Sequence, residues 1–134
     1  ASLADKPAAV EEFTRQLAEL VRRFHQAGLV HRDLYAAHVF LDVSTGRREL
    51  YLIDLARVFR PVRWRRFRWR VKDLAQLRYS MPEAWVTQQW ELFLKTYLPP
   101  AEQGRLARWQ IAIERKTQRM RRRGRRKKQE KNNA

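Results

Sequence analysis

The first regular pattern along the chain is a run of apolar residues at spacings of three and four, which predicts an amphipathic helix over residues 9–26. The apolar stripe of this helix consists of Val10, Phe13, Leu17, Leu20, Val21 and Phe24. Gly28 follows as the predicted stop, because glycine adopts the left-handed backbone that ends many helices at little cost. His25 stands near the end of the helix, and we expect it at the surface.

Two short apolar runs after this helix predict a β-hairpin. Residues 39–41 and residues 49–53 have the length and composition of strands, and residues 44–46 form a turn signal between them. The second run closes on Asp54, so an acidic residue is expected where the hairpin ends.

The second half of the chain is predicted to be mainly helical. Residues 72–79 and 83–97 carry apolar side chains at helical spacing, and the proline pair at residues 99–100 ends the second helix. A last helix is expected to begin near Ala101, with Leu106 and Ile113 on its inner face. We expect three tryptophans of these helices in the core and not in a binding site: Trp85, Trp90 and Trp109.

Residues 60–72 form the ambiguous segment of the chain. Phe67, Trp69 and Val71 alternate with basic residues, which allows a short extended stretch. Trp64, Phe67 and Trp69 have two open interpretations: they contact an anionic glycolipid or membrane surface, or they belong to the core. With a single hairpin among several helices, the predicted fold class is mostly α with a small β-hairpin.

Charge is the next constraint, because the 134 residues include 30 Lys and Arg but only 14 Asp and Glu, a net charge of +16. Eleven basic residues lie in residues 115–131 and seven lie in residues 60–72. Such a chain attracts polyanions, namely anionic membrane, phosphorylated glycolipid or nucleic acid. We expect one domain over residues 1–114 and a basic tail, disordered or frayed helical, over residues 115–134. The absence of cysteine excludes disulfides and thiolate metal sites.

The most specific chemical pattern is the tripeptide His31-Arg32-Asp33, followed by His38 and then by Asp54 at the end of the hairpin. Phosphoryl transfer requires a carboxylate that positions the attacking hydroxyl, and ligands that hold magnesium against the phosphates. A His-Arg-Asp loop, a ligand five residues past its Asp and a second Asp after a hairpin supply those groups. Because the hairpin reverses the chain, we expect the two carboxylates at one edge, facing a common cleft.

Three segments, residues 31–42, 50–58 and 69–77, together resemble the bacterial lipopolysaccharide kinase family. Its members phosphorylate heptose or 3-deoxy-manno-octulosonic acid in the inner core of lipopolysaccharide. The resemblance implies the C-terminal lobe of a protein-kinase-like (α+β) fold, with ATP and Mg2+ as cofactors. It also implies the lipopolysaccharide core glycolipid as partner, and action at the cytoplasmic face of the inner membrane, in contact with its anionic surface.

Carried over by position, the resemblance gives Asp33 the role of catalytic carboxylate and Asp54 that of magnesium ligand. His38 occupies the position of a second metal ligand, where protein kinases have Asn. Because magnesium prefers oxygen ligands, one alternative is that the imidazole of His38 hydrogen-bonds a phosphate or a metal-bound water instead of the metal, and another is that His38 is a packed polar residue. Asp73 corresponds to an Asp that braces the catalytic loop from a following helix.

His31 and Arg32 complete the expected catalytic loop. We expect His31 to hold the loop backbone by hydrogen bonds and Arg32 to pair with a charge near the loop. A plainer interpretation keeps Arg32 as a solvated side chain, and treats Asp33 and Asp54 as loop carboxylates that pair with neighbouring arginines.

A kinase-like fold also needs a glycine-rich phosphate loop and a Lys–Glu pair upstream of the catalytic loop. The thirty residues before His31 contain neither, so we expect the N-terminal lobe to be absent and the chain alone to bind ATP poorly and to be inactive. Two other functions stay open. One is a non-catalytic basic module that binds anionic membrane or, with less support because no reader fold is recognisable, nucleic acid. The other is a protein or small-molecule kinase of the same superfamily.

Overall fold

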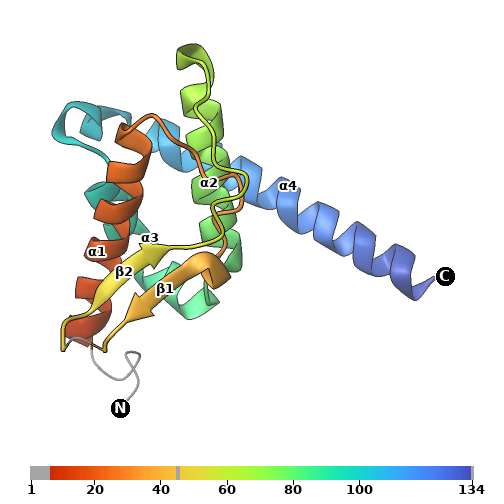
Figure 1. The fold of residues 1–134 in the computed structure, drawn as a ribbon. Coiled ribbons are helices and arrows are strands. Elements are labelled where there is room, and N and C mark those ends of the chain that lie inside the picture. Colours follow the sequence, from red (N-terminus) through yellow and green to blue (C-terminus); the bar gives the residue numbers. More distant parts are fainter. Residues whose placement is uncertain (1–6, 45, 134) are drawn as a thin grey trace.

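The computed structural model describes residues 7–44 and 46–133, and Figure 1 shows their arrangement. The elements in chain order are α1 (Pro7–Gln26), the 3-10 helix η2 (Ala36–His38), β1 (Val39–Asp42), β2 (Glu49–Leu52), η3 (Arg63–Arg65), α2 (Arg66–Ser80), α3 (Glu83–Tyr97), η4 (Pro100–Arg105) and α4 (Leu106–Asn132). The prediction of a mostly helical fold with a small hairpin is confirmed. Thr45, at the centre of the predicted turn signal, lies outside the described residues.

The α-helices surround one apolar core, in which α1 packs against α3 and α2 packs against α4. The predicted stripe of α1 faces this core, where Leu17 and Val21 are fully buried. Each large apolar side chain buried in this way contributes about 1.5–3 kcal/mol to folding. The three tryptophans predicted to be core residues are buried: Trp85, Trp90 and Trp109.

Helix α2 begins earlier than the sequence pattern indicates. The extended stretch considered for residues 67–72 is wrong, because this segment lies inside one continuous α-helix. Its apolar side chains alternate because they pack in different directions. Val71 is buried in the core, Phe67 lies edge-on to Trp109 with ring centroids 4.7 Å apart, and Trp69 contacts the segment between the hairpin and η3.

Helix α4 differs from the prediction at both ends. The segment from Ala101 forms η4, and α4 itself begins at Leu106. Beyond Arg115, where disorder or fraying was expected, the helix continues to Asn132 and extends away from the body of the protein (Figure 1). Arginine and lysine are good helix formers, so the helix persists after its apolar stripe has ended. It crosses the expected boundary between residues 114 and 115 without a break.

The hairpin connects the helices to the loop that carries the candidate chemistry. Phe40 pairs with Tyr51 across the two antiparallel strands, and both side chains are exposed. The backbone N–H of Ile53 donates to the carbonyl of His38 (2.9 Å), which extends the pairing past the end of the strands. Asp54 therefore leaves the hairpin directly beside the residues that precede β1.

The turn after α1 contains the glycine that the sequence marks as the helix stop. Gly28 has a φ of +87°, and its N–H donates to the carbonyl of His25 (2.9 Å). Val30 and Phe59 then form an isolated antiparallel bridge, with both N–H···O distances near 3 Å (3.0 and 3.2 Å). This bridge brings the segment that follows Asp54 back alongside the loop that follows α1.

Replacing Gly28 with alanine should lower the free energy of unfolding by about 1–2 kcal/mol, because an L-residue is strained in the left-handed region. The added methyl group would also lie 2.9 Å from Nη1 of Arg60, which donates to the carbonyl of Ala27. Gly104→Ala is the matched control, since no heavy atom lies within 4 Å of its added Cβ. Urea unfolding followed by circular dichroism compares the two variants, and an equal loss in both would contradict the prediction.

Candidate active site

The loop that follows α1 is held in place by a buried carboxylate of α2. Asp73 is fully buried, and its oxygens accept hydrogen bonds from the backbone N–H groups of His31 (2.8 Å) and Arg32 (2.9 Å). Hydrogen bonds to a charged acceptor are roughly twice as strong as neutral ones, so this pair fixes the loop firmly on the helix. The sequence analysis expected a brace of this kind from Asp73.

His25 is buried, which corrects the expectation that it lies at the surface. Its Nε2–H donates to the Asp73 carboxylate (2.8 Å), and Nδ1 accepts from the hydroxyl of Tyr97 (2.6 Å). Burial lowers the pKa of His25 and raises that of Tyr97, so the neutral imidazole that this bonding pattern requires is the favoured form. The resulting chain of hydrogen bonds runs from α3 through α1 to the carboxylate that holds the loop.

Two further residues of α2 hold the loop, and the sequence analysis missed both. Gln76 accepts a hydrogen bond from the N–H of Leu34 (3.0 Å) and donates to the carbonyl of Arg32 (2.8 Å), while the Ser80 hydroxyl accepts from the N–H of Ala36 (2.7 Å). A signal was present in the sequence. Asp73, Gln76 and Ser80 recur at spacings of three and four, which places three polar residues on one helix face.

His31 is fully buried inside the loop. Its Nε2–H donates to the carbonyl of Ile53 (2.9 Å), and its Nδ1 accepts from the N–H of Asp33 (3.2 Å). These two bonds connect the loop to the end of the hairpin through one neutral imidazole. The hydrogen bonds to the loop backbone that the sequence predicts for His31 are therefore present.

His38 lies between the two acidic residues singled out by the sequence. Its Nδ1–H donates to the backbone carbonyl of Asp33 (2.6 Å), and its Nε2 lies 3.2 Å from Oδ2 of Asp54. Because Nδ1 carries the proton of the neutral ring, Nε2 presents a lone pair to a carboxylate oxygen, which is also a lone-pair donor. Two such atoms approach favourably only when a proton or a cation lies between them.

The side chain of Asp33 is one-fifth exposed, and its Oδ1 accepts from Nη1 of Arg57 at 2.9 Å. The plainer interpretation, a loop carboxylate paired with a neighbouring arginine, thus describes one oxygen of Asp33. Asp54 contacts His38 instead, and its side chain is about half exposed.

Arg32 does not make the expected contact with a charge: among residues 7–44 and 46–133 its side chain forms no ion pair. Its guanidinium lies over the rings of Phe59 (5.2 Å) and Trp69 (5.4 Å), where the negative faces of the rings attract it. The cation packs against two rings that also contact each other, so packing and not an ion pair orders this side of the loop.

Backbone strain is concentrated in the same place. Arg32 (φ 75°) and Asp54 (φ 58°) are the non-glycine residues with positive φ in the described part of the chain. A left-handed non-glycine residue costs of order 1–3 kcal/mol and persists where the surrounding contacts hold it. One such residue stands in the loop and the other at the end of the hairpin, on the two sides of His38.

Comparison with known proteins identifies this arrangement. The sequence pattern of the lipopolysaccharide kinase (Kdo/WaaP) family matches residues 2–97, which include the loop, the hairpin and α2. The chain belongs to the lipopolysaccharide kinase (Kdo/WaaP) family. The resemblance that the sequence motifs carry is thereby confirmed.

Similar proteins of this family are lipopolysaccharide core heptose(I) kinases named WaaP. The one from Escherichia coli (strain K12) is 39% identical over 88 residues, and the one from Pseudomonas aeruginosa is 37% identical over 101 residues. These alignments cover 61% and 69% of this chain but 32% and 34% of the two relatives. The chain therefore spans about a third of the length of the curated relatives it matches.

A solved structure, described as WaaP in complex with acyl carrier protein, has a similar fold. It matches with a TM-score of 0.63 and 32% sequence identity, over 82% of this chain and 48% of that one. The match supports the arrangement of the helices and hairpin described above.

The side chains at the end of the hairpin supply only part of the coordination shell that magnesium needs. Among residues 7–44 and 46–133, no group of three or more His, Asp or Glu side chains converges on one point. Magnesium is commonly held by one or two carboxylates together with substrate phosphates and waters, so Asp54 with His38 beside it is a sufficient protein contribution. The Nδ1–H bond of His38 to the Asp33 carbonyl fixes the orientation of this imidazole, as outer contacts do for histidines that bind metals in other proteins.

No helix in residues 7–44 and 46–133 of this family member combines the length and the apolar composition needed to cross a bilayer. The longest helix, α4, has 27 residues, but most of them are charged or polar.

Proposed function

We propose that this chain is the catalytic-loop part of an ATP-dependent phosphotransferase that acts on a sugar hydroxyl of the lipopolysaccharide inner core. The observation that carries the proposal is the position of His38, whose ring touches the backbone of Asp33 on one side and the carboxylate of Asp54 on the other. Membership of the lipopolysaccharide kinase family supports it.

In this proposal the carboxylate of Asp33 orients the acceptor hydroxyl and takes its proton. The hydroxyl oxygen bonds to the γ-phosphorus of ATP while the bond from that phosphorus to the β,γ-bridging oxygen breaks, and ADP leaves with the bonding electrons. Oδ2 of Asp33 is available for this role, because the contact with Arg57 occupies Oδ1. Asp54 and His38 would hold magnesium, which supplies positive charge against the phosphates.

We further propose that the chain corresponds to the C-terminal lobe of a protein-kinase-like fold and that residues outside it bind most of the nucleotide. The hairpin supports this, since it exposes apolar side chains beside Asp54. Phe40 is 52% exposed, Ile53 42% and Leu55 55%. Exposed apolar residues that lie together mark a surface that another part of a protein, or a ligand, covers.

The proposed place of action is the cytoplasmic face of the inner membrane, where the acceptor glycolipid is held. The exposed basic residues of α4 beyond Arg115 support this, because each Lys or Arg near an anionic surface contributes about 1 kcal/mol to attachment. The same observation favours the second candidate function, a non-catalytic module attached to anionic membrane.

The test measures transfer of the radiolabelled γ-phosphate of ATP to dephosphorylated inner-core lipopolysaccharide, using the product of the complete reading frame that contains this chain. We expect label in a sugar phosphate ester. Asp54→Asn should raise the magnesium concentration needed for half-maximal rate by at least about tenfold, since one carboxylate ligand is lost. Glu49→Gln, on the same hairpin but in contact with Tyr51, is the matched control and should leave the magnesium requirement unchanged.

Three outcomes would contradict the proposal. Label on protein instead of glycolipid would indicate a protein kinase. Absence of transfer, together with salt-dependent binding to anionic vesicles, would support the non-catalytic module. An unchanged magnesium requirement in Asp54→Asn would remove Asp54 from the metal site.

A further inference from the structure

A basic pocket of about 480 Å3 lies between α2 and α4, outside the residues to which the proposed reaction has been assigned. It is lined by Arg65, Phe67, Arg68, Trp69, Val71, Lys72, Ala112, Arg115, Lys116 and Arg119. Six of these ten side chains are cationic and none is acidic. Its volume lies in the range of sites that bind small molecules.

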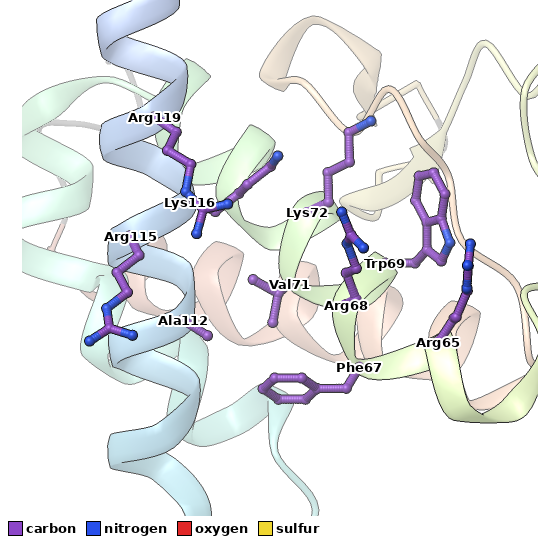
Figure 2. A pocket seen from close by; sticks show the side chains of 10 residues that line it. All are labelled: Arg65, Phe67, Arg68, Trp69, Val71, Lys72, Ala112, Arg115, Lys116 and Arg119. Atoms are coloured by element: carbon purple, nitrogen blue, oxygen red, sulfur yellow. The ribbon is translucent and has the colours of Figure 1, made fainter.

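The cations of the basic pocket come from two helices, and Figure 2 shows how they are placed. Arg68 and Lys72 belong to α2, and Lys116 and Arg119 belong to α4 on the opposite wall. Arg115 lies at the outer side of α4 in this view, and its guanidinium points away from α2. The pocket thus presents positive charge from both sides of one gap.

These charges have no acidic partner within the described part of the chain. None of the pocket cations takes part in an ion pair among residues 7–44 and 46–133. Burial lowers the pKa of Lys116, and the charges of Arg123, Lys72, Arg119 and Arg68 lower it further. Like charges that converge in a partly buried gap repel one another, and a bound anion removes that repulsion.

The floor of the basic pocket is apolar, and it adjoins the candidate active site. Phe67, Val71 and Ala112 supply apolar surface, and Trp69 adds an indole ring. Trp69 connects the pocket to the catalytic loop, since the guanidinium of Arg32 in that loop lies 5.4 Å from the Trp69 ring. Lys72 lies on the same side, where the charges of Asp33 and Asp73 act on it.

We propose that the basic pocket binds the phosphate groups of a phosphorylated saccharide between the cations of α2 and α4 and holds its sugar ring against Phe67. Guanidinium and ammonium groups are the side chains that bind phosphate, and aromatic rings pack on the C–H faces of sugars. The proposal rests on the proposed function, because it gives the acceptor a binding site next to Asp33. The volume of the pocket suits a compact ligand better than an extended polyanion.

The experiment titrates the 134-residue chain with fructose 1,6-bisphosphate by calorimetry at physiological salt, without ATP or magnesium. Fructose and inorganic pyrophosphate are the comparison ligands. The double variant Arg68→Gln/Lys116→Gln should weaken binding of the bisphosphate at least about tenfold, because the loss of even one charge-assisted hydrogen bond weakens binding by about that factor. The melting temperature of this double variant should not fall, since two unbalanced positive charges are removed. Arg68→Gln alone changes an exposed position and should also weaken binding of the bisphosphate.

The matched control is Arg125→Gln/Lys127→Gln, which removes the same charge from an exposed part of α4 outside the pocket. We expect it to bind the bisphosphate within about twofold of the wild type, because distant surface charges are screened. Equal weakening in the two double variants would show general attraction of anions and overturn the proposal. Equal affinity for pyrophosphate and the sugar bisphosphate would overturn the part assigned to the sugar.

Two further measurements separate this proposal from others. Pocket-dependent binding to phosphatidylcholine vesicles that contain phosphatidic acid, without competition by the sugar bisphosphate, would assign the pocket to a lipid headgroup and overturn the proposal. Asp33→Asn should bind the bisphosphate as the wild type does. A failure of the phosphotransferase assay is therefore distinguishable from a failure of the pocket.

Discussion

Replacing Asp73 with alanine should lower the free energy of unfolding by about 3–5 kcal/mol, because removal of one partner from a buried charged network leaves the others unpaired. The N–H groups of His31 and Arg32 and the Nε2–H of His25 would each lose their acceptor inside the protein. Native proteins have total stabilities of about 5–15 kcal/mol, so the loss should remove a large fraction of the total. Urea unfolding followed by circular dichroism measures the loss.

Asp54→Ala is the control for this prediction, because it removes the same chemical group from a half-exposed position that has one contact, to Nε2 of His38. Its expected cost is less than about 1 kcal/mol, the usual value of an exposed pair. His25→Ala should fall between the two, since it breaks the hydrogen bonds to Asp73 and Tyr97 but leaves both backbone bonds to the loop. An Asp73→Ala protein as stable as Asp54→Ala would show that the loop does not depend on the buried carboxylate.

The first half of the fold was predictable because its signals are local. The stripe of α1 repeats over about four turns, and each strand of the hairpin is an apolar run on one side of a turn signal. Residues 60–72 were not predictable, because Phe67, Trp69 and Val71 pack in different directions on a helix and look in sequence like the alternation of a strand. The start of α4 depends on η4, and a six-residue 3-10 helix that begins at the second of two prolines has no periodicity from which it could be predicted.

The residues of the candidate site also divide into those that have a local sequence signal and those that do not. Asp33, His38 and Asp54 were found because they belong to one ordered motif of about two dozen residues. The role of His25 depends on a residue 48 positions later, so no local pattern contains it. One clue was available, since His25 continues the spacing of four set by Leu17 and Val21 and so lies on the buried face of α1.

The distribution of charge is the clearest case in which sequence alone was insufficient. Counting residues gives two basic segments, 60–72 and 115–131, with no indication that they meet. The packing of α2 against α4 brings Arg68 and Lys116 to one pocket, whereas Arg125 and Lys127 stay on the exposed end of the same helix. The net charge of the chain therefore has two separate physical sources, a pocket lined by basic residues and an exposed basic helix end.

Asp33→Asn should lower the rate of phosphate transfer by the complete protein by about two to four orders of magnitude, the usual contribution of a general base. The amide keeps the size of the side chain but cannot take the proton of the acceptor hydroxyl, so the turnover number should fall while the affinity for the acceptor changes little. Asp42→Asn is the control, because its carboxylate bonds to Ser44 at the exposed end of β1. If Asp33→Asn kept the wild-type turnover number, Asp33 would be only the partner of Arg57, and the phosphotransferase would need another base.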